Sequence, residues 1–187
     1  MANKTGSIEV IYGCMFSGKT EELIRRVEIS RKAKLSIAVF KPSIDKRYDE
    51  TSIVSHNSNF ILATSVENSA AILVQGLVCQ VVAIDEAQFF DEALPDVCTA
   101  LAAKKIHVII AGLDLDYKAQ PFGAMPKLMA IADELVRLYA VCVKCGEPAT
   151  LSYRTSSSES KILIGEKESY EPRCKTCFYS SDTTSTP

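Results

Sequence analysis

The sequence predicts an α/β protein, with a parallel β-sheet covered by helices on both faces and a small second domain at the C-terminus. Between residues 8 and 111, short β-branched runs alternate with stretches of helical periodicity, which is typical of right-handed βαβ units. The run 81–84 is apolar throughout, as expected for the buried middle of a parallel sheet. After residue 140 the composition shifts to Cys, Ser, Lys and Glu, which indicates a domain boundary near residue 141.

The expected elements follow one another at short intervals. We expect strands at residues 8–12, 37–40, 81–84, 107–111, 149–153 and 161–164, and helices from about residue 18 onward, at 70–77 and at 91–105. The first helix places Leu23, Ile24 and Val27 on one face. Residues 42–60 lack clear periodicity and predict a mobile loop with a short strand. The expected domains are therefore 1–140 and 141–179, followed by a disordered tail at 180–187.

Composition and charge limit the classes of function. The 187 residues are 47% hydrophobic and 24% charged, which suits one globular domain with a small appendage. A formal net charge of −2 gives no electrostatic footprint for general nucleic-acid binding. No targeting segment is visible and the apolar runs are too short to span a bilayer, so we expect a cytoplasmic protein. The seven cysteines are then thiols or metal ligands rather than disulfides.

A phosphate-binding loop joins the first strand to the first helix. It matches the pattern G-x-x-x-x-G-K-[ST] in full, through Gly13, Cys14, Met15, Phe16, Ser17, Gly18, Lys19 and Thr20. The glycines let successive backbone N–H groups face phosphate oxygens at the positive end of the helix. Lys19 reaches the β- and γ-phosphates and the Thr20 hydroxyl ligates Mg²⁺. The sequence therefore predicts an ATP and Mg²⁺ site on a P-loop, RecA-like sheet.

Two carboxylates follow the apolar strand 81–84. Asp85 suits the Mg²⁺ shell of a P-loop protein, and Glu86, which projects differently, suits a general base that takes a proton from an acceptor hydroxyl. The carboxyl end of a strand is also where ligands bind in open α/β sheets. The alternative is that these two acids only begin an exposed loop.

Two C-x-x-C pairs lie in the C-terminal segment. Cys142, Cys145, Cys174 and Cys177 can place four thiolates around a structural Zn²⁺, in a zinc-ribbon-like domain that hydrophobic burial alone would not fold. The 28 residues 146–173 exceed the usual spacing between such pairs, which implies an inserted loop. A redox C-x-x-C motif and unpaired structural thiols remain alternatives.

Taken in order, these motifs resemble the cellular-type (type II) thymidine kinases. The resemblance rests on the phosphate loop, the string Asp85–Phe90, Pro121–Gly123 and the cysteine quartet, and covers about residues 6–178. It implies transfer of the ATP γ-phosphate to the 5′-hydroxyl of thymidine, and also of deoxyuridine, in nucleotide salvage. It further implies a homotetramer and feedback inhibition by thymidine triphosphate.

The same resemblance assigns site residues. Glu86 matches the catalytic base, and the ATP site comprises Gly13–Thr20 together with Asp85, Glu86, Ala87 and Gln88. Residues 161–170 match a lasso-like loop over the substrate, and Asp45 and Arg47 match a D-x-R motif of uncertain chemistry. The implied nucleoside-binding residues are Met15, Phe89, Leu113, Tyr117, Phe122, Ser152, Gly165 and Tyr170.

Two rival functions belong to other classes. A RecA- or helicase-type ATPase would use Glu86 to activate water, but the chain is short, is slightly acidic and contains no second motor domain. A zinc-ribbon interaction module with a vestigial nucleotide fold predicts loss of Lys19, Thr20 or Glu86, and all three are present.

Overall fold

A six-stranded parallel sheet forms the centre of the protein. The computed structural model describes residues 6–44, 52–54, 60–155 and 169–180. The strand order is β5-β2-β6-β7-β1-β8, and each neighbouring pair is parallel. These strands are β1 (Ser7–Tyr12), β2 (Ile37–Pro42), β5 (Thr64–Val66), β6 (Val81–Ile84), β7 (His107–Gly112) and β8 (Glu134–Arg137). The sequence-based prediction of a parallel α/β sheet is confirmed.

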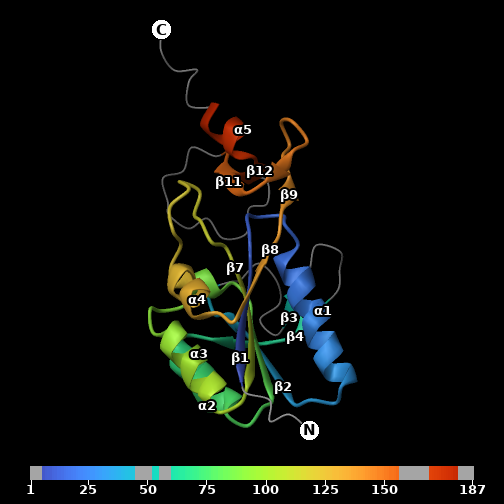
Figure 1. Cartoon of the computed structure of the whole chain (residues 1–187), viewed down its shortest axis with the longest axis vertical. Coiled ribbons are helices and arrows are strands. Elements are labelled where there is room, and N and C mark those ends of the chain that lie inside the picture. Colours follow the sequence, from blue (N-terminus) through green and yellow to red (C-terminus); the bar gives the residue numbers. More distant parts are fainter. Residues whose placement is uncertain (1–5, 45–51, 55–59, 156–168, 181–187) are drawn as a thin grey trace.

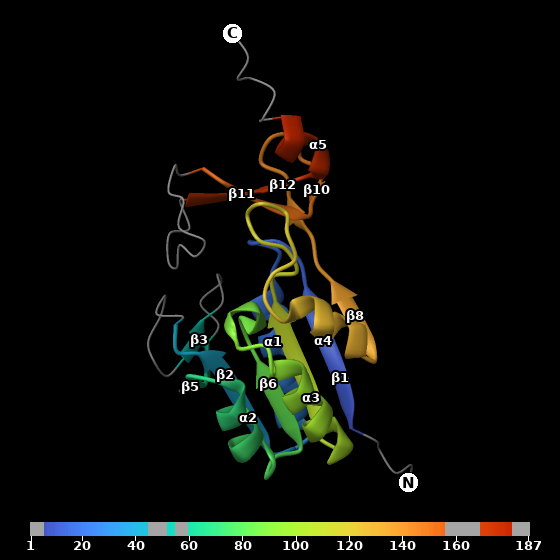
Figure 2. The same cartoon turned by 90° about the vertical axis from the view of Figure 1, so that its left-hand side faces the viewer.

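Helices cover both faces of this sheet, as predicted. Helix α1 (Lys19–Lys32) lies on one face, and α2 (Ser69–Gly76), α3 (Leu94–Ala103) and α4 (Met125–Ile131) lie on the other (Figures 1 and 2). Because successive side chains of a strand point to opposite faces, β6 contributes to the cores on both faces of the sheet. Val82 and Ile84 belong to the core under α2–α4, whereas Val81 and Ala83 belong to the core under α1.

Several boundaries differ from the sequence-based expectations. The helix expected at 91–105 covers only Leu94–Ala103. Pro95 lies in its first turn, and Asp91 instead accepts hydrogen bonds from the backbone N–H groups of Ser69 and Ala93. Elements α4, β5 and β8 were not predicted, and the 3-10 helix η1 (Ala87–Phe89) was not predicted either.

The C-terminal segment forms a small module at the carboxyl end of the sheet (Figure 1). Strands β9 (Ala140–Val141) and β10 (Pro148–Ala149) make one antiparallel pair, and β11 (Leu151–Arg154) and β12 (Tyr170–Arg173) make a second. Helix α5 (Lys175–Tyr179) follows. The strand expected at 149–153 is thus divided between β10 and β11, and the one expected at 161–164 lies outside the described residues.

The region expected to be a mobile loop contains an antiparallel pair, β3 (Ser52–Val54) and β4 (Phe60–Leu62). Asp45 and Arg47 of the D-x-R motif and the tail 181–187 lie outside the described residues. Within the described ranges, no helix combines the length and the apolar character needed to cross a membrane.

Candidate active site

The phosphate loop connects β1 to α1 with an unusual backbone. Gly13 and Gly18 have φ of 152° and 85°, and Phe16 between them has φ of 66°. A Cβ atom on Gly13 would lie 2.3 Å from the carbonyl oxygen of Leu138, so no larger residue fits there without a shift. The loop therefore has the curled, glycine-dependent form that exposes backbone N–H groups to an anion.

Lys19 and Thr20 begin α1 directly behind this loop. Lys19 Nζ donates to the carbonyl oxygen of Cys14 at 2.8 Å, and Thr20 Oγ1 donates to Asp85 Oδ2 at 3.2 Å. Burial lowers the pKa of Lys19 below its ordinary value, while the negative charges of Glu86 and Asp85 act in the opposite direction. The Ser17 Oγ atom is buried without a hydrogen-bond partner among the described residues, which fits a site shaped for phosphate oxygens.

The two acids after β6 point to different partners. Asp85 is only 6% exposed and contacts Thr20, so this pair does not merely begin an exposed loop. Glu86 has φ of 52°, and its Oε2 accepts a hydrogen bond from Gln88 Nε2 at 2.5 Å. Gln88 Oε1 in turn accepts from the backbone N–H of Leu113 at 2.9 Å. The Glu86 carboxylate is therefore fixed by the chain that follows β7.

A third acid, Asp114, was missed by the sequence reasoning. Its Oδ1 atom is buried and has no hydrogen-bond partner within the described part of the chain. With Glu86 and Asp85, its negative charge partly opposes the lowering of the Lys19 pKa by burial. The available signal was position: Asp114 follows β7 as Asp85 follows β6, and parallel strands bring their carboxyl ends to one edge.

Two aromatic residues, one from η1 and one from the segment before α4, pack against each other. The rings of Phe89 and Phe122 pack edge to face with centroids 5.5 Å apart. Gly123 allows this approach, since a Cβ there would lie 2.2 Å from the Gln88 carbonyl oxygen and its φ is 52°. Leu113, the first residue after β7, donates its backbone N–H to the side chain of the same Gln88.

Tyr117 and Tyr170 meet through a residue that the sequence reasoning did not single out. The Arg154 guanidinium carbon lies 3.5 Å from the centroid of the Tyr117 ring, and Arg154 Nη2 donates to the Tyr170 hydroxyl at 2.5 Å. Gly165 lies outside the described residues, as does most of the lasso-like loop at 161–170.

The C-terminal module packs directly on the phosphate loop. Cys14 Sγ donates to the carbonyl oxygen of Ala149 at 3.4 Å, and the Met15 N–H donates to Ser152 Oγ at 3.0 Å. Cys14 is 2% exposed, and this burial raises the pKa of its thiol. The loop and the module thus share one small core, which also contains Ala140, Cys142 and Ala149.

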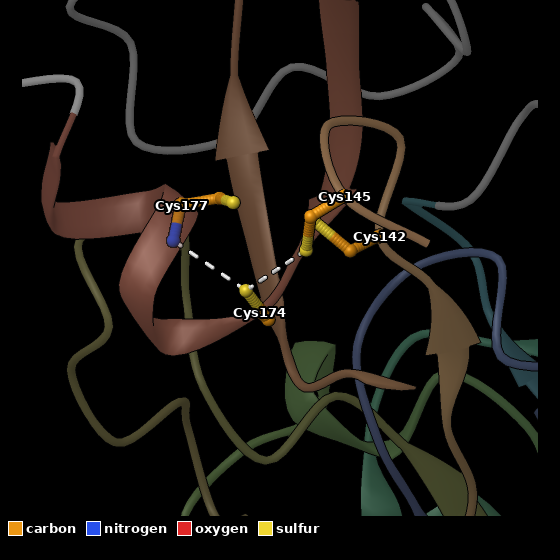
Figure 3. A group of neighbouring side chains, drawn as sticks. All are labelled: Cys142, Cys145, Cys174 and Cys177. Carbon is orange, nitrogen blue, oxygen red and sulfur yellow. Dashed lines mark hydrogen bonds between the residues drawn. The ribbon is translucent and has the colours of Figure 1, made fainter. Parts of the chain in front are cut away.

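The four predicted metal ligands come together in this module (Figure 3). The sulfur atoms of Cys142, Cys145, Cys174 and Cys177 all lie within 4.8 Å of one another, and Cys145 and Cys174 are 3.6 Å apart. Four thiolates around tetrahedral Zn²⁺ would place their sulfurs about 3.8 Å apart, so the cluster fits that ion. Burial raises the pKa of the Cys142 thiol, but hydrogen bonds to it from the backbone of Cys174 and Lys144 outweigh this effect. The resulting pKa is lowered to about 6.

Comparison with known proteins agrees with this geometry. The sequence model described as thymidine kinase matches residues 6–178. The chain belongs to the thymidine kinase family. This membership confirms the resemblance inferred from the motifs and, with it, the class of enzyme: a P-loop kinase.

Family members of high identity cover most of the chain. The thymidine kinase of Bacteroides thetaiotaomicron is 53% identical over 175 residues, covering 94% of this chain and 88% of the relative. That of Porphyromonas gingivalis is 51% identical, with 94% and 86% covered. That of a Rhodothermus species is 48% identical, with 97% and 85% covered.

Among solved structures, the genome packaging NTPase B204 of Sulfolobus turreted icosahedral virus 2, in complex with ATP-gammaS, has a TM-score of 0.47 at 15% identity. The match covers 73% of this chain and 76% of that one.

Proposed function

We propose that this chain transfers the γ-phosphoryl group of ATP to the 5′-hydroxyl of thymidine, and also of deoxyuridine, in nucleotide salvage. Membership of the thymidine kinase family supports the reaction. The observation that carries the proposal is that Glu86 directly follows Asp85, which contacts Thr20, and that Gln88, next to the Phe89–Phe122 pair in the chain, hydrogen-bonds the Glu86 carboxylate. A base that must reach an acceptor beside the γ-phosphate suits such a position.

ATP would lie along the loop Gly13–Thr20, with Asp85, Glu86, Ala87 and Gln88 at its γ-phosphate end. The backbone N–H groups and Lys19 would bind phosphate oxygens, and Thr20 and Asp85, which already contact each other, would hold the shell of Mg²⁺. The bound Mg²⁺ would neutralise charge on the phosphates. Asp114 would keep the local field negative around Lys19.

Glu86 would act as the general base. As the 5′-oxygen of the nucleoside attacks the γ-phosphorus, the hydroxyl proton moves to the Glu86 carboxylate and the bond to the ADP oxygen breaks. The hydrogen bond from Gln88 Nε2 to Oε2 restricts the orientation of the Glu86 carboxylate, as a base in a fixed position requires.

The nucleoside would bind against residues of both parts of the chain. Phe89, Leu113, Tyr117 and Phe122 come from the loops at the sheet edge, whereas Ser152 and Tyr170 come from β11 and β12. A buried pyrimidine requires such aromatic walls with a few fixed polar groups. Met15 and Gly165 complete the proposed set, and residues 161–170 would close over the substrate to exclude water.

The remaining proposals concern the whole molecule. We assign ATP binding to residues 1–140 and zinc binding with substrate closure to 141–179, with Zn²⁺ bound by Cys142, Cys145, Cys174 and Cys177 in a structural role. A homotetramer in the cytoplasm is the proposed working form.

A nucleoside panel tests this function. The purified protein is incubated with Mg²⁺-ATP and, separately, thymidine, deoxyuridine, deoxycytidine or no nucleoside, and ADP release is followed. We expect thymidine and deoxyuridine to stimulate ADP release by at least about tenfold over the reaction without nucleoside. ADP release of equal rate in every reaction would favour the ATPase alternative instead.

A further inference from the structure

Arg154 on β11 connects two aromatic residues that come from different parts of the chain. Its guanidinium carbon lies 3.5 Å from the ring centroid of Tyr117, which belongs to the loop after β7. Its Nη2 and Nε atoms donate to the hydroxyl of Tyr170 at 2.5 and 3.1 Å. A stacked guanidinium that also donates two hydrogen bonds has little freedom to rotate, so it fixes both partners.

The register of the hairpin explains this arrangement. Arg154 lies directly opposite Tyr170 in the β11–β12 pair, and Ser152 lies opposite Pro172. Alternate residues of a strand share a face, so Ser152 and Arg154 point the same way. Ser152 accepts a hydrogen bond from Met15 of the phosphate loop. This face of the hairpin is therefore directed toward the ATP-binding part.

The opposite face of the same hairpin has a different neighbour. Tyr153 packs edge to face on Phe178 of α5, with ring centroids 5.7 Å apart. Arg173 lies 3.4 Å from the Tyr153 ring centroid and donates to Glu171 at 2.9 Å. Arg173 thus resembles Arg154 in strand pairing, in stacking on a tyrosine and in exposure, which is 6% against 9%.

We infer that Arg154 is a positioning residue that holds Tyr117 and Tyr170 as two walls of the nucleoside pocket. The inference rests on the proposed function, because both tyrosines are walls only if thymidine binds there. Arg154 sets the distance between the two parts of the chain that enclose the base. Without Arg154, Tyr117 stays in its loop and Tyr170 in its strand, but nothing described links the two side chains through a shared contact.

The expected signature is a change in nucleoside affinity without a change in ATP affinity. Arg154→Gln is expected to raise the KM for thymidine by about tenfold or more, because small errors in substrate position carry large costs. The KM for ATP is expected to stay within about twofold, since the Met15–Ser152 contact is intact. Arg154→Lys keeps the charge but cannot both stack on Tyr117 and donate to Tyr170. Its KM for thymidine should therefore lie between that of the unmodified protein and that of Arg154→Gln.

Arg173→Gln is the matched control. Both arginine variants lose a buried stacking contact in the same hairpin, so both should lower the melting temperature by similar amounts. Only Arg154→Gln should raise the thymidine KM. Equal KM values in the two variants, or an unchanged KM in Arg154→Gln, would overturn the inference.

A double variant keeps the test decisive if Arg154→Gln does not fold. Tyr170→Phe removes only the hydroxyl that accepts from Arg154. Arg154→Lys should then raise the thymidine KM less in the Tyr170→Phe background than in the unmodified protein, because the lost contact is shared. Strictly additive effects would contradict the inference. Failure of the unmodified protein to phosphorylate thymidine would instead refute the proposed function.

Discussion

The side-chain amide of Gln88 donates a hydrogen bond from Nε2 to Oε2 of Glu86 at 2.5 Å. Its other end accepts from the backbone N–H of Leu113 at 2.9 Å, so one side chain connects the ends of β6 and β7. Gln88 is 3% exposed, so its side chain is largely shielded from solvent. The orientation of the proposed base therefore depends on Gln88, a second residue of the proposed ATP site.

Replacement of Gln88 tests this dependence. Gln88→Met keeps the volume but removes the hydrogen bond to Glu86 Oε2 and the acceptor of the Leu113 N–H. We expect stability to fall by about 1–3 kcal/mol and kcat to fall by at least about tenfold. Urea denaturation and steady-state kinetics measure the two effects. A stable variant with unchanged kcat would show that Glu86 needs no such support.

Glu86 itself should affect turnover rather than ATP binding. Glu86→Gln keeps the shape of the side chain and one acceptor oxygen for Gln88, but its amide cannot accept the hydroxyl proton. We expect kcat to fall by about 10²- to 10⁴-fold, with little change in ATP affinity. Direct titration with ATP, alongside kinetics, separates these quantities. A parallel loss of both would argue against the base assignment.

Two glycines with positive φ provide a matched pair. Gly123 has φ of 52° and a Cβ there would meet the Gln88 carbonyl oxygen at 2.2 Å, whereas Gly146 has φ of 79° with nothing within 4 Å of its Cβ. Gly146→Ala should cost only the backbone strain of about 1–2 kcal/mol. Gly123→Ala should cost more and also lower kcat, because Gln88 must move. Thermal unfolding and kinetics of the two variants check this, and equal effects in both would contradict it.

The cysteine cluster should contain metal in the purified protein. We expect about one zinc per chain by elemental analysis, and loss of that zinc in Cys174→Ser. The C-terminal module hydrogen-bonds Cys14 and Met15 of the phosphate loop. Metal loss should therefore also raise the KM for ATP. A zinc-free protein with an unchanged melting temperature and ATP affinity would refute the structural metal site.

The parts of the fold that the sequence could predict are those with a local pattern. Strands β1, β6 and β7 are rich in β-branched residues, and the α1 face of Leu23, Ile24 and Val27 has helical spacing. Strand β8 was missed because it lies at the sheet edge, where Glu134, Leu135 and Arg137 are exposed and no apolar run is required.

The residues of the candidate site also fall into two groups: those that a local motif predicts and those that it does not. The phosphate loop and the cysteine pairs are short motifs, so their residues were identified from spacing alone. Asp114 and Arg154 belong to no motif, and their positions depend on strand order and on the β11–β12 register. Only tertiary structure brings Arg154 to Tyr117, which is 37 positions earlier in the chain.

The identity of the phosphorylated product tests the central claim most directly. Protein, Mg²⁺-ATP and thymidine are incubated together, and ADP, thymidine 5′-monophosphate and inorganic phosphate are quantified by chromatography and ³¹P NMR. The proposed transfer predicts ADP and thymidine 5′-monophosphate in equal amounts with little inorganic phosphate. ADP matched instead by inorganic phosphate, with no nucleotide formed from thymidine, would contradict it.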